Sequence, residues 1–322
     1  MNSVRFRLLI LALAPMVVLM PLLLFLGMTR WTADYDEVLI ANVESDLRIA
    51  EQYLSRLMVE TGDQLQAVAG SVEFAQTPPG GFAAFFADKR AALGLDFLYY
   101  LPRNAAAGWP VIDSAAQGQG RTEIDIFPGA ALAAISPDLA ARARLPLIET
   151  EAAVPTDRTV EDRGMVIHSA TPVTLPGRDG VLVGGILLNR NLGFIDTINA
   201  LVYLDAGAEG SRQGTATLFL EDVRVSTNVR LFEDVRALGT RVSAAVRGQV
   251  LGQGETWLDR AFVVNDWYIS GYLPLTDSYG AYVGMLYVGF LEEPFTTAKR
   301  NAFIAILGAF VVVMLISAPL FL

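Results

Sequence analysis

Apolar residues are concentrated at the two ends of the chain. The runs Leu8–Met28 and Ala302–Leu322 contain no charged residue. A helix needs about 20 predominantly apolar residues to cross the hydrocarbon core of a bilayer. We therefore expect two transmembrane helices, the first within residues 1–30 together with a short cytoplasmic N-terminus, and the second within residues 299–322.

The first run has a second interpretation, because Arg5 and Arg7 precede it as in the charged region of a cleaved signal peptide. The apolar part of a signal peptide spans about 7 to 15 residues and ends at small residues. This run is longer and is followed by Arg30 and Trp31, which are typical anchors at a membrane interface. A membrane helix is the favoured interpretation.

The distribution of charge predicts the orientation. Arg5 and Arg7 precede the first run, and acidic residues follow it at 34–37, which favours a cytoplasmic N-terminus and an extracytoplasmic middle. Lys299 and Arg300, just before the second run, favour the opposite orientation weakly. Because the second run extends to Leu322, we expect a cytoplasmic output region to follow it.

Between the runs, residues 31–76 show a helical period. Apolar residues recur there mostly at steps of three or four, at Leu39, Val43, Leu47, Ala50, Leu54, Leu57, Leu65, Val68 and Val72. The pattern predicts a long amphipathic helix, ended by the Pro/Gly cluster Thr77–Gly81. Its polar face carries Glu44, Arg48, Glu51 and Arg56, and the helix either packs only on its own domain or also pairs across a dimer.

The rest of the extracytoplasmic part reads as short helices and strands. We expect strands at Phe97–Leu101, Met165–Ala170 and Val181–Leu188, and a helix at Ala130–Arg144 after Pro128 and Gly129. This mixture predicts an α+β fold.

A hairpin-like pattern occurs twice, about one hundred residues apart. Ile167–Leu192 has the predicted turn Asp179-Gly180 between two apolar segments, and Ser270–Val288 has Tyr279-Gly280 at the same place. The polar, glycine-rich segment Asp205–Gly214 lies between the copies and has the composition of a linker. A strand at Thr215–Glu221 then begins the second unit, so we expect two related modules.

The second unit resembles the membrane-proximal module of double Cache sensor domains. The resemblance is carried by five segments: Gly214–Leu220, Arg224–Arg230, Gly239–Ser243, Arg260–Tyr268 and Gly284–Gly289. In that family, a long N-terminal helix and two PAS-like modules, each an antiparallel sheet with flanking helices, stand between two transmembrane helices. The resemblance implies that this chain has the family's layout of a long N-terminal helix and two modules between two transmembrane helices. The distal module would span residues 77–204 and the proximal module residues 205–298.

Composition narrows the possible functions. The net charge of −10 argues against nucleic acid as a partner, and the absence of cysteine excludes disulfides and thiolate metal sites. The chain has one histidine and lacks G-x-S-x-G, H-E-x-x-H and P-loop motifs, so we expect no catalytic site in this chain. Carboxylate pairs such as Glu149 with Glu151 are usually solvated, and we expect neither a metal nor a cofactor.

Candidate ligand-binding residues come from residue types that suit a sensor pocket. The family's amino-acid-binding pattern of tyrosine, arginine, tryptophan and aspartate has no position-by-position match here, so the ligand class stays open. In the distal module, residues of suitable type are Tyr99, Tyr100, Arg103, Trp109, Asp113 and His168. Arg103 has the bidentate fork that suits a carboxylate, and Asp113 suits an ammonium group. A secondary pocket, or else structural hydrogen bonds, would involve Arg224, Asn228, Arg241, Trp257 and Tyr268.

The resemblance implies a bacterial inner-membrane protein that binds a small molecule in the periplasm or outside the cell. Its partners would be that ligand, the lipid bilayer and a second copy of the chain in a homodimer. We expect the input region of a two-component sensor histidine kinase. The input region of a methyl-accepting chemotaxis receptor or of a cyclic-dinucleotide cyclase is the alternative, and a periplasmic enzyme or an adhesion module is a more remote one.

Overall fold

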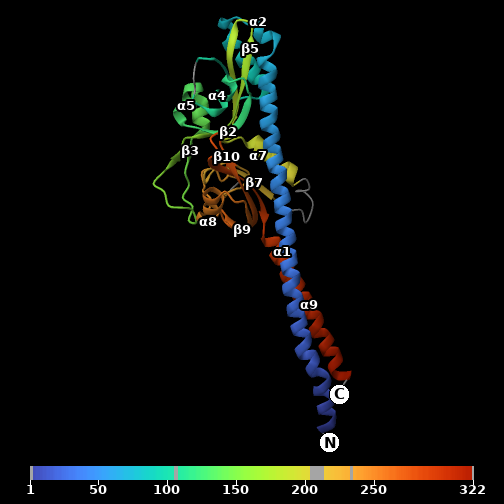
Figure 1. The fold of residues 1–322 in the computed structure, drawn as a ribbon. Coiled ribbons are helices and arrows are strands. Elements are labelled where there is room, and N and C mark those ends of the chain that lie inside the picture. The colour runs from blue at the N-terminus through green and yellow to red at the C-terminus, as the bar shows by residue number, and fades with distance from the viewer. Residues whose placement is uncertain (1–2, 105–107, 204–213, 233–234, 321–322) are drawn as a thin grey trace. The chain divides into compact units, whose positions relative to one another are not determined.

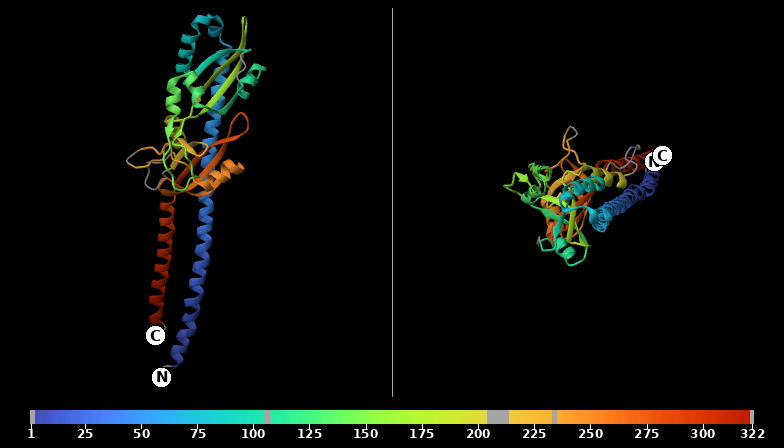
Figure 2. Two further views of the ribbon diagram at one scale, coloured as in Figure 1. Left: turned by 90° about the vertical axis from the view of Figure 1, so that its left-hand side faces the viewer. Right: turned by 90° about the horizontal axis from the view of Figure 1, so that it is seen from above.

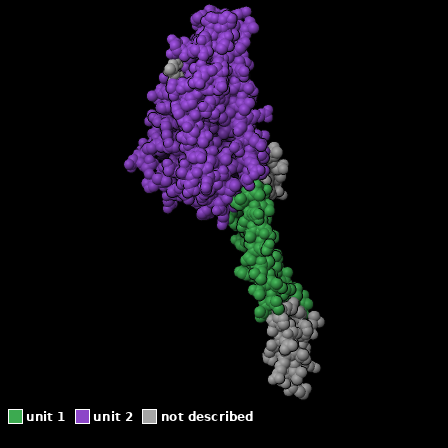
Figure 3. Space-filling view, viewed as in Figure 1, with its two compact units in different colours: residues 1–42, 291–322 green, residues 43–290 purple. Residues whose placement is uncertain are grey.

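The computed structural model describes residues 3–104, 108–203, 214–232 and 235–320, with side chains from Val18 to Ile316. The chain divides into two compact units, one of residues 1–42 and 291–322 and one of residues 43–290, which are coloured separately in Figure 3. The predicted linker Asp205–Gly214 lies almost entirely outside the described residues.

The first unit consists of the N-terminal part of helix α1 (Ser3–Ala69) and of helix α9 (Glu293–Leu320). The two helices contact each other where the Tyr35 and Phe295 rings lie 6.4 Å apart and where Lys299 pairs with Asp36. Among the residues whose side chains are described, one segment is long and apolar enough to cross a membrane. It is Glu293–Ile316, with 24 residues and a mean hydropathy of 1.9.

The first predicted span, Leu8–Met28, lies entirely within α1, but the side chains of residues 8–17 are outside the described set. Val18, Leu23 and Phe25, which belong to the described part of that span, are exposed.

The second unit contains two antiparallel sheets. The distal sheet has the order β1-β6-β5-β2, and the proximal sheet has the order β8-β7-β11-β10-β9. The distal strands are β1 (Phe97–Pro102), β2 (Arg121–Phe127), β5 (Gly164–Leu175) and β6 (Arg178–Leu187), with a separate small pair β3 (Leu145–Pro146) and β4 (Val160–Glu161). The proximal strands are β7 (Gly214–Leu220), β8 (Val223–Thr227), β9 (Trp257–Val263), β10 (Asp266–Thr276) and β11 (Tyr282–Leu291). Figure 2 shows the long hairpin of β5 and β6.

Short helices accompany the sheets. They are α2 (Val72–Gln76), η1 (Pro79–Gly81), α3 (Phe82–Leu93), α4 (Pro110–Ala116), α5 (Gly129–Ile135), α6 (Pro137–Ala143), α7 (Leu192–Val202), α8 (Ala244–Arg247) and the π-helical turn η2 (Gly248–Gln253). In Figure 1, α1 lies on one side of the distal sheet, and α4 and α5 lie on the other. Helix α7 packs on β7 and β8 of the proximal sheet.

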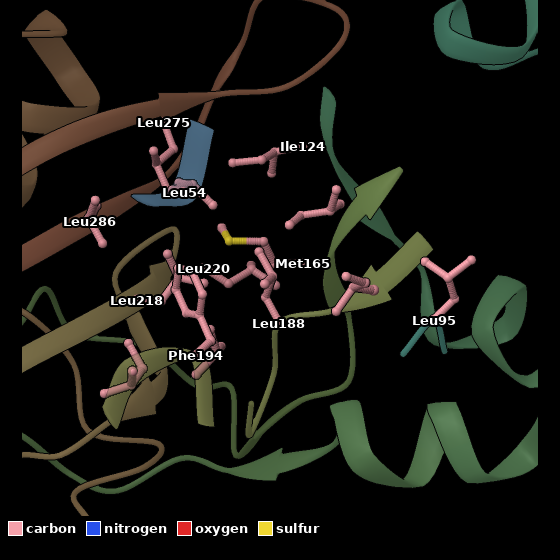
Figure 4. Packing of buried hydrophobic residues seen from close by; sticks show 14 of the residues in the cluster. Leu54, Leu95, Ile124, Met165, Leu188, Phe194, Leu218, Leu220, Leu275 and Leu286 are labelled. Carbon is pink, nitrogen blue, oxygen red and sulfur yellow. The ribbon is translucent and has the colours of Figure 1, made fainter. Parts of the chain in front are cut away.

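Alternation along the strands separates two hydrophobic cores in the distal module. Ile167 on β5 and Leu182 on β6 share a cluster with Leu54 and Leu65 of α1. Val166 on β5 belongs to a second cluster, with residues of α4, α5 and α6. The first cluster continues into the proximal module through such residues as Met165, Leu188, Leu218 and Leu220, which Figure 4 shows close together.

The predicted strands are confirmed, since each one falls within β1, β5, β6 or β7, apart from one residue at the ends of the last two. Two element boundaries differ from the prediction. Helix α1 ends at Ala69, before Gly70. A separate helix, α2, begins after Ser71, whose side chain accepts a hydrogen bond from the Phe74 amide. The helix predicted at Ala130–Arg144 is two helices, because Ser136 has extended backbone and caps α6 ahead of Pro137.

The turn predicted at Asp179-Gly180 is wrong. Leu175 pairs with Arg178, so the turn is Pro176-Gly177, and Gly177 has φ +76°. Proline followed by a glycine with positive φ is typical of a type II turn. Gly180 lies within β6, where a Cβ atom would come 2.3 Å from the Leu101 carbonyl oxygen, so this glycine permits close strand contact.

Candidate ligand site around His168

His168 lies in the middle of β5, on the face of the distal sheet that packs against α4. Its side chain is fully buried, with three aromatic rings close to it. The Phe127 and Trp109 rings meet the imidazole edge to face, with centroids 4.9 and 5.6 Å away, and the Phe97 ring lies at 6.4 Å. Trp109 also stacks on Phe127 at 4.7 Å. The histidine is therefore enclosed in an aromatic box formed by β1, β2 and the start of α4.

The two nitrogens of His168 have different environments. Nδ1 lies 2.8 Å from Oδ2 of Asp125, which is fully buried on β2. Nε2 is buried and contacts no hydrogen-bond partner among the described residues. A carboxylate accepts a hydrogen bond from the N–H group at Nδ1, and in a neutral imidazole this places the lone pair on Nε2. Nε2 is thus a free acceptor inside the aromatic box.

Asp125 also joins the two modules. Its Oδ1 accepts hydrogen bonds from the Ser278 hydroxyl at 2.6 Å and from the Ser278 amide at 3.3 Å. Ser278 lies in the turn between β10 and β11 of the proximal sheet. In the same turn, the Tyr279 hydroxyl donates to the Gly108 carbonyl at 2.8 Å, and the Tyr279 ring lies 6.2 Å from Trp109.

A hollow adjoins the box along β1. It has a volume of about 550 Å³ and is lined by Phe97, Tyr99, and residues of α3 and of the end of α5. Phe97 contributes to both the hollow and the box. Burial raises the pKa of Tyr99 to about 12, so its phenol is protonated at neutral pH. Tyr99 therefore offers a hydroxyl group to an occupant of the hollow.

A larger groove, of about 770 Å³, lies on the other side of the distal sheet. Its lining comes from α1, including Asp63 and Gln66, and from β2 and β5, including Arg121 and Thr171. Some of its polar groups already have partners within the chain, since Arg121 forms an ion pair with Glu123 at 3.1 Å. The groove lacks a fully buried polar atom without a partner among those described, unlike the box around His168.

The other distal candidates lie outside the box. Arg103 is exposed and its guanidinium is held by Asp179, with Nε to Oδ1 at 2.8 Å and Nη2 to Oδ1 at 2.6 Å. The hydrogen bonds from Arg103 hold the pKa of Asp179 below its ordinary value. Asp113 is exposed on α4, and Tyr100 donates to the Asp179 carbonyl at 3.0 Å. The structure thus brings together Trp109 and His168, with Tyr99 beside them, and leaves Arg103 and Asp113 at the surface.

The proximal candidates are spread over the second sheet. Asn228 accepts a hydrogen bond from the Ala216 amide at 2.7 Å, and Arg241 pairs with the buried Asp222 at 2.6 Å. Trp257 is partly exposed at the start of β9. Arg224 on β8 and Tyr268 on β10 are both buried.

Four residues in or beside the box were not among the predicted site residues: Phe97, Asp125, Phe127 and Ser278. Asp125 carries a signal in the sequence, because it interrupts the apolar segment Ile124–Phe127 of a buried strand. An ionisable group in such a strand needs a partner, and His168 is that partner. Ser278 carries no comparable signal.

Part of the chain matches a known protein family. Residues 186–302 match the model of the family described as single Cache domain 3, a range that includes the whole proximal sheet. The chain carries a Cache-type extracytoplasmic sensor domain. The predicted resemblance is confirmed. No significant match was found among curated proteins.

Comparison with solved structures returned several sensor domains. The periplasmic domain of Vibrio cholerae LuxQ has a TM-score of 0.39 and 10% identity, covering 78% of this chain and 98% of that one. The sensory domain of the Campylobacter jejuni chemoreceptor Tlp3 with isoleucine bound has a TM-score of 0.39 and 10% identity, covering 82% and 94%. The ligand-binding domain of the Pseudomonas aeruginosa PAO1 amino acid chemoreceptor PctB with L-Arg has a TM-score of 0.34 and 14% identity, covering 80% and 94%.

Proposed function

We propose that this Cache-type chain is the ligand-sensing and transmembrane region of a bacterial sensor histidine kinase, with its ligand bound at the box around His168. The observation that carries the ligand site is the buried Nε2 atom, which has no hydrogen-bond partner among the described residues. Leaving a buried polar atom unpaired costs about 1 to 3 kcal/mol, and a ligand that pairs with it recovers that free energy.

The chemistry of the box favours a particular class of ligand. Nε2 of a neutral imidazole accepts a hydrogen bond, so the ligand carries an amino, amide or hydroxyl donor. The walls from Phe97, Trp109 and Phe127 are apolar and aromatic, and they suit a small body with an apolar or cationic part. Tyr99 provides a further hydroxyl at the adjoining hollow.

Transmission of the signal would use the contact between Asp125 and Ser278. A ligand on His168 changes the position or charge distribution of the His168–Asp125 pair, and Asp125 holds the turn between β10 and β11. Strand β11 leads directly to α9, the helix with the apolar span. Coupling of about 1 to 3 kcal/mol would bias a two-state output.

The proposal includes a second membrane span at Leu8–Met28, homodimerisation and a kinase output following Leu322. A chemoreceptor or cyclase output is the alternative. A helix with a phosphoacceptor histidine after Leu322 would support the kinase, and a long methylated coiled coil would support the chemoreceptor. Crosslinking of single-cysteine variants at exposed positions of α1, such as Val38, Ile49 and Val59, tests the homodimer in membranes. Absence of any crosslinked dimer would count against it.

The ligand site is tested by thermal unfolding of the full chain in lipid nanodiscs against amines, amino acids, alcohols and carboxylates. A ligand that binds only the folded chain raises its stability by about 2.7 kcal/mol at a hundredfold excess over its dissociation constant. The variant His168→Asn keeps an amide donor near Asp125 and removes Nε2. We expect it to fold and to bind the ligand at least about tenfold more weakly, corresponding to about 1.4 kcal/mol.

The matched control is Trp267→Phe, which changes an exposed aromatic residue of the proximal module. It should leave the affinity for the ligand unchanged. A ligand that binds His168→Asn and the unmodified chain equally would remove the box from the proposal.

A further inference from the structure

The hairpin of β9 and β10 carries exposed aromatic side chains near its turn. Phe262 and Trp267 lie directly opposite each other on the two strands, and their ring centroids are 5.7 Å apart in an edge-to-face arrangement. Phe262 is 46% exposed and Trp267 is 55% exposed. Two adjacent exposed rings form an apolar patch, which is a sign of a contact surface, whereas a single exposed ring would be ordinary. We call residues 262–267 the hairpin tip.

Val264 adds an apolar side chain to the hairpin tip at a conformational cost. It has φ +61°, a left-handed conformation that glycine and asparagine adopt with less strain. Val264 is partly exposed, so burial in the core does not explain a valine at this place. Strained backbone of this kind is concentrated at functional sites. The valine therefore indicates that the hairpin tip makes an apolar contact.

The hairpin tip lies at the end of the proximal sheet where the chain leaves β11. Strands β10 and β11 are neighbours in the sheet. The Asp277 amide donates to the Ala281 carbonyl at 3.0 Å, and a Cβ atom on Gly289 would lie 2.9 Å from the Ile269 carbonyl oxygen. Both contacts fit one antiparallel register, in which Trp267 lies at the end of β11. The turn therefore projects past the end of β11 by about 7 to 10 Å, at about 3.3 Å per residue.

The chain from β11 to the apolar segment of α9 is short. β11 ends at Leu291, and the segment that is long and apolar enough to cross a membrane begins at Glu293. If only the uncharged run from Ala302 lies in the hydrocarbon core, the helix from Glu293 to Ala302 spans about 14 Å. The headgroup layer on each side of the core is about 5 to 7 Å thick. The projection of the turn and the depth of this layer are together about as long as that helical tether.

We propose that the hairpin tip docks on the extracytoplasmic surface of the lipid bilayer. The proposal rests on the proposed membrane span of α9 and is independent of the ligand at the box around His168. Tryptophan and other aromatic side chains favour the membrane interface, because an apolar ring and a polar group suit its two sides. A docked tip would hold the proximal sheet at the membrane and limit the motion that β11 passes to α9.

The charges of the hairpin tip define which lipid surface it suits. Residues 262–267 include Asp266 and contain no basic residue. Attraction to anionic headgroups needs lysine or arginine, so the contact depends on insertion of the apolar side chains among neutral headgroups. Docking should therefore occur on phosphatidylcholine and should not strengthen when an anionic lipid is added.

Spin labelling tests the docking in the full chain, which has no cysteine of its own. A nitroxide is attached to Asn265→Cys in the turn, with the chain in phosphatidylcholine nanodiscs. The matched control is Glu255→Cys, an exposed position at the opposite end of the hairpin. We expect the ratio of collisions with oxygen to collisions with a water-soluble nickel complex to be at least about threefold higher in the turn than at the control. Equal ratios would overturn the proposal.

A third label separates failure of the docking from failure of the membrane span. Val312→Cys lies at an exposed position of the apolar segment of α9 and reports the span by itself. A high oxygen-to-nickel ratio at this label, together with equal ratios in the turn and at Glu255→Cys, would overturn the docking and leave the span in place. A low ratio at Val312→Cys would overturn both.

Substitutions in the aromatic pair show whether these rings hold the tip on the lipid. The double variant Phe262→Ser, Trp267→Ser changes exposed side chains, and we expect the ratio at the turn label to fall to the control value. Trp267→Phe keeps an aromatic ring and should retain most of the ratio. A ratio that stays high in the double variant would show that the tether alone brings the tip near the lipid, and it would overturn the docking. Trp267→Ser alone decides the point if the double variant does not fold.

A second copy of the chain is the competing occupant of the hairpin tip. It would shield the turn label from oxygen and from nickel alike, and the labels of two copies would broaden each other's spectra. Low accessibility to both reagents, with broadening that disappears on dilution with unlabelled chain, would therefore overturn the proposal of a lipid contact.

Discussion

The carboxylate of Asp125 in the distal module accepts both the hydroxyl and the amide hydrogen bonds of Ser278 in the proximal module, at 2.6 and 3.3 Å. The other oxygen of Asp125 lies 2.8 Å from His168 Nδ1. One buried residue therefore contacts both the candidate ligand site and the turn that precedes β11. This relationship gives the sensor proposal a physical route from one module to the other.

Replacing Asp125 with Asn should destabilise the chain and weaken the connection between its modules. The carboxylate of Asp125 has two acceptor oxygens, whereas the side-chain amide of asparagine has one oxygen and one NH2 group. The NH2 group would face a hydrogen-bond donor, so we expect a loss of about 2 to 3 kcal/mol in the free energy of unfolding. Ser278→Ala removes one hydroxyl and keeps the amide, and it should cost about 1 kcal/mol. Urea denaturation followed by tryptophan fluorescence measures both. An equal, small effect of the two changes would show that the charge of Asp125 contributes nothing.

Low pH should weaken a second connection between the modules. Arg163, just before β5, donates to Glu161 at 2.8 Å and to Glu221 of the proximal module at 2.7 Å. Burial opposes ionisation of Glu161, but hydrogen bonds from Arg163 and Arg158 outweigh it and hold its pKa below the ordinary value. Hydrogen bonding to Arg163 also lowers the pKa of Glu221, against the effect of burial.

Because both folded-state pKa values are lowered, the unfolded chain takes up protons first as the pH falls. The stabilisation is fully present above about pH 4.5 and is lost as the pH falls through the lowered values. Arg163→Gln should cost about 3 kcal/mol at pH 7, since it leaves the buried Glu161 less compensated, and should reduce the loss of stability below pH 4.5. Arg48→Gln breaks only the exposed pair with Glu44 and should change the stability by less than about 0.5 kcal/mol. Identical pH profiles for the two variants would contradict this account.

Much of the fold could be predicted from local patterns. The helical period of α1 and the apolar strands β1, β5 and β6 are properties of short segments, and the structure contains them. The box around His168 is different, because its geometry depends on strand register. Glu123 is the residue directly opposite His168, and Asp125 reaches it diagonally. A shift of one residue would place Asp125 on the other face of the sheet, and no local pattern fixes that register.

The error at the hairpin between β5 and β6 has a similar cause. Asp179-Gly180 and Pro176-Gly177 are both turn signals, and only the pairing with β1 distinguishes them. Pro102 pairs with Gly180, and this contact requires a residue without a Cβ atom. Arg103 was a plausible ligand group by type alone, yet its own partner, Asp179, lies 76 residues away on that hairpin. Such a partner emerges only when the strands are in place.

Gly180→Ala should therefore destabilise the distal sheet. The added Cβ would lie 2.3 Å from the Leu101 carbonyl oxygen, so β1 and β6 must separate locally, at a cost of about 1 to 3 kcal/mol. Gly193→Ala is the matched control, because its Cβ has no neighbour closer than 3.9 Å and its position is helical. That change should stabilise the chain by up to about 1 kcal/mol. A neutral Gly180→Ala variant would show that the strands adjust without cost.

Val264 offers a site where stability can be gained. It lies in the two-residue turn between β9 and β10 with φ +61°, a left-handed conformation that is unusual for a β-branched residue. That conformation costs an L-residue about 1 to 2 kcal/mol, and glycine adopts it freely but loses some chain entropy on folding. We expect Val264→Gly to raise the free energy of unfolding by about 0.5 to 1 kcal/mol. Asn265→Gly, at the neighbouring position without a positive φ, should give no gain. Denaturant titration of both variants decides the point, and a loss of stability in Val264→Gly would mean that contacts of the valine side chain outweigh the backbone strain.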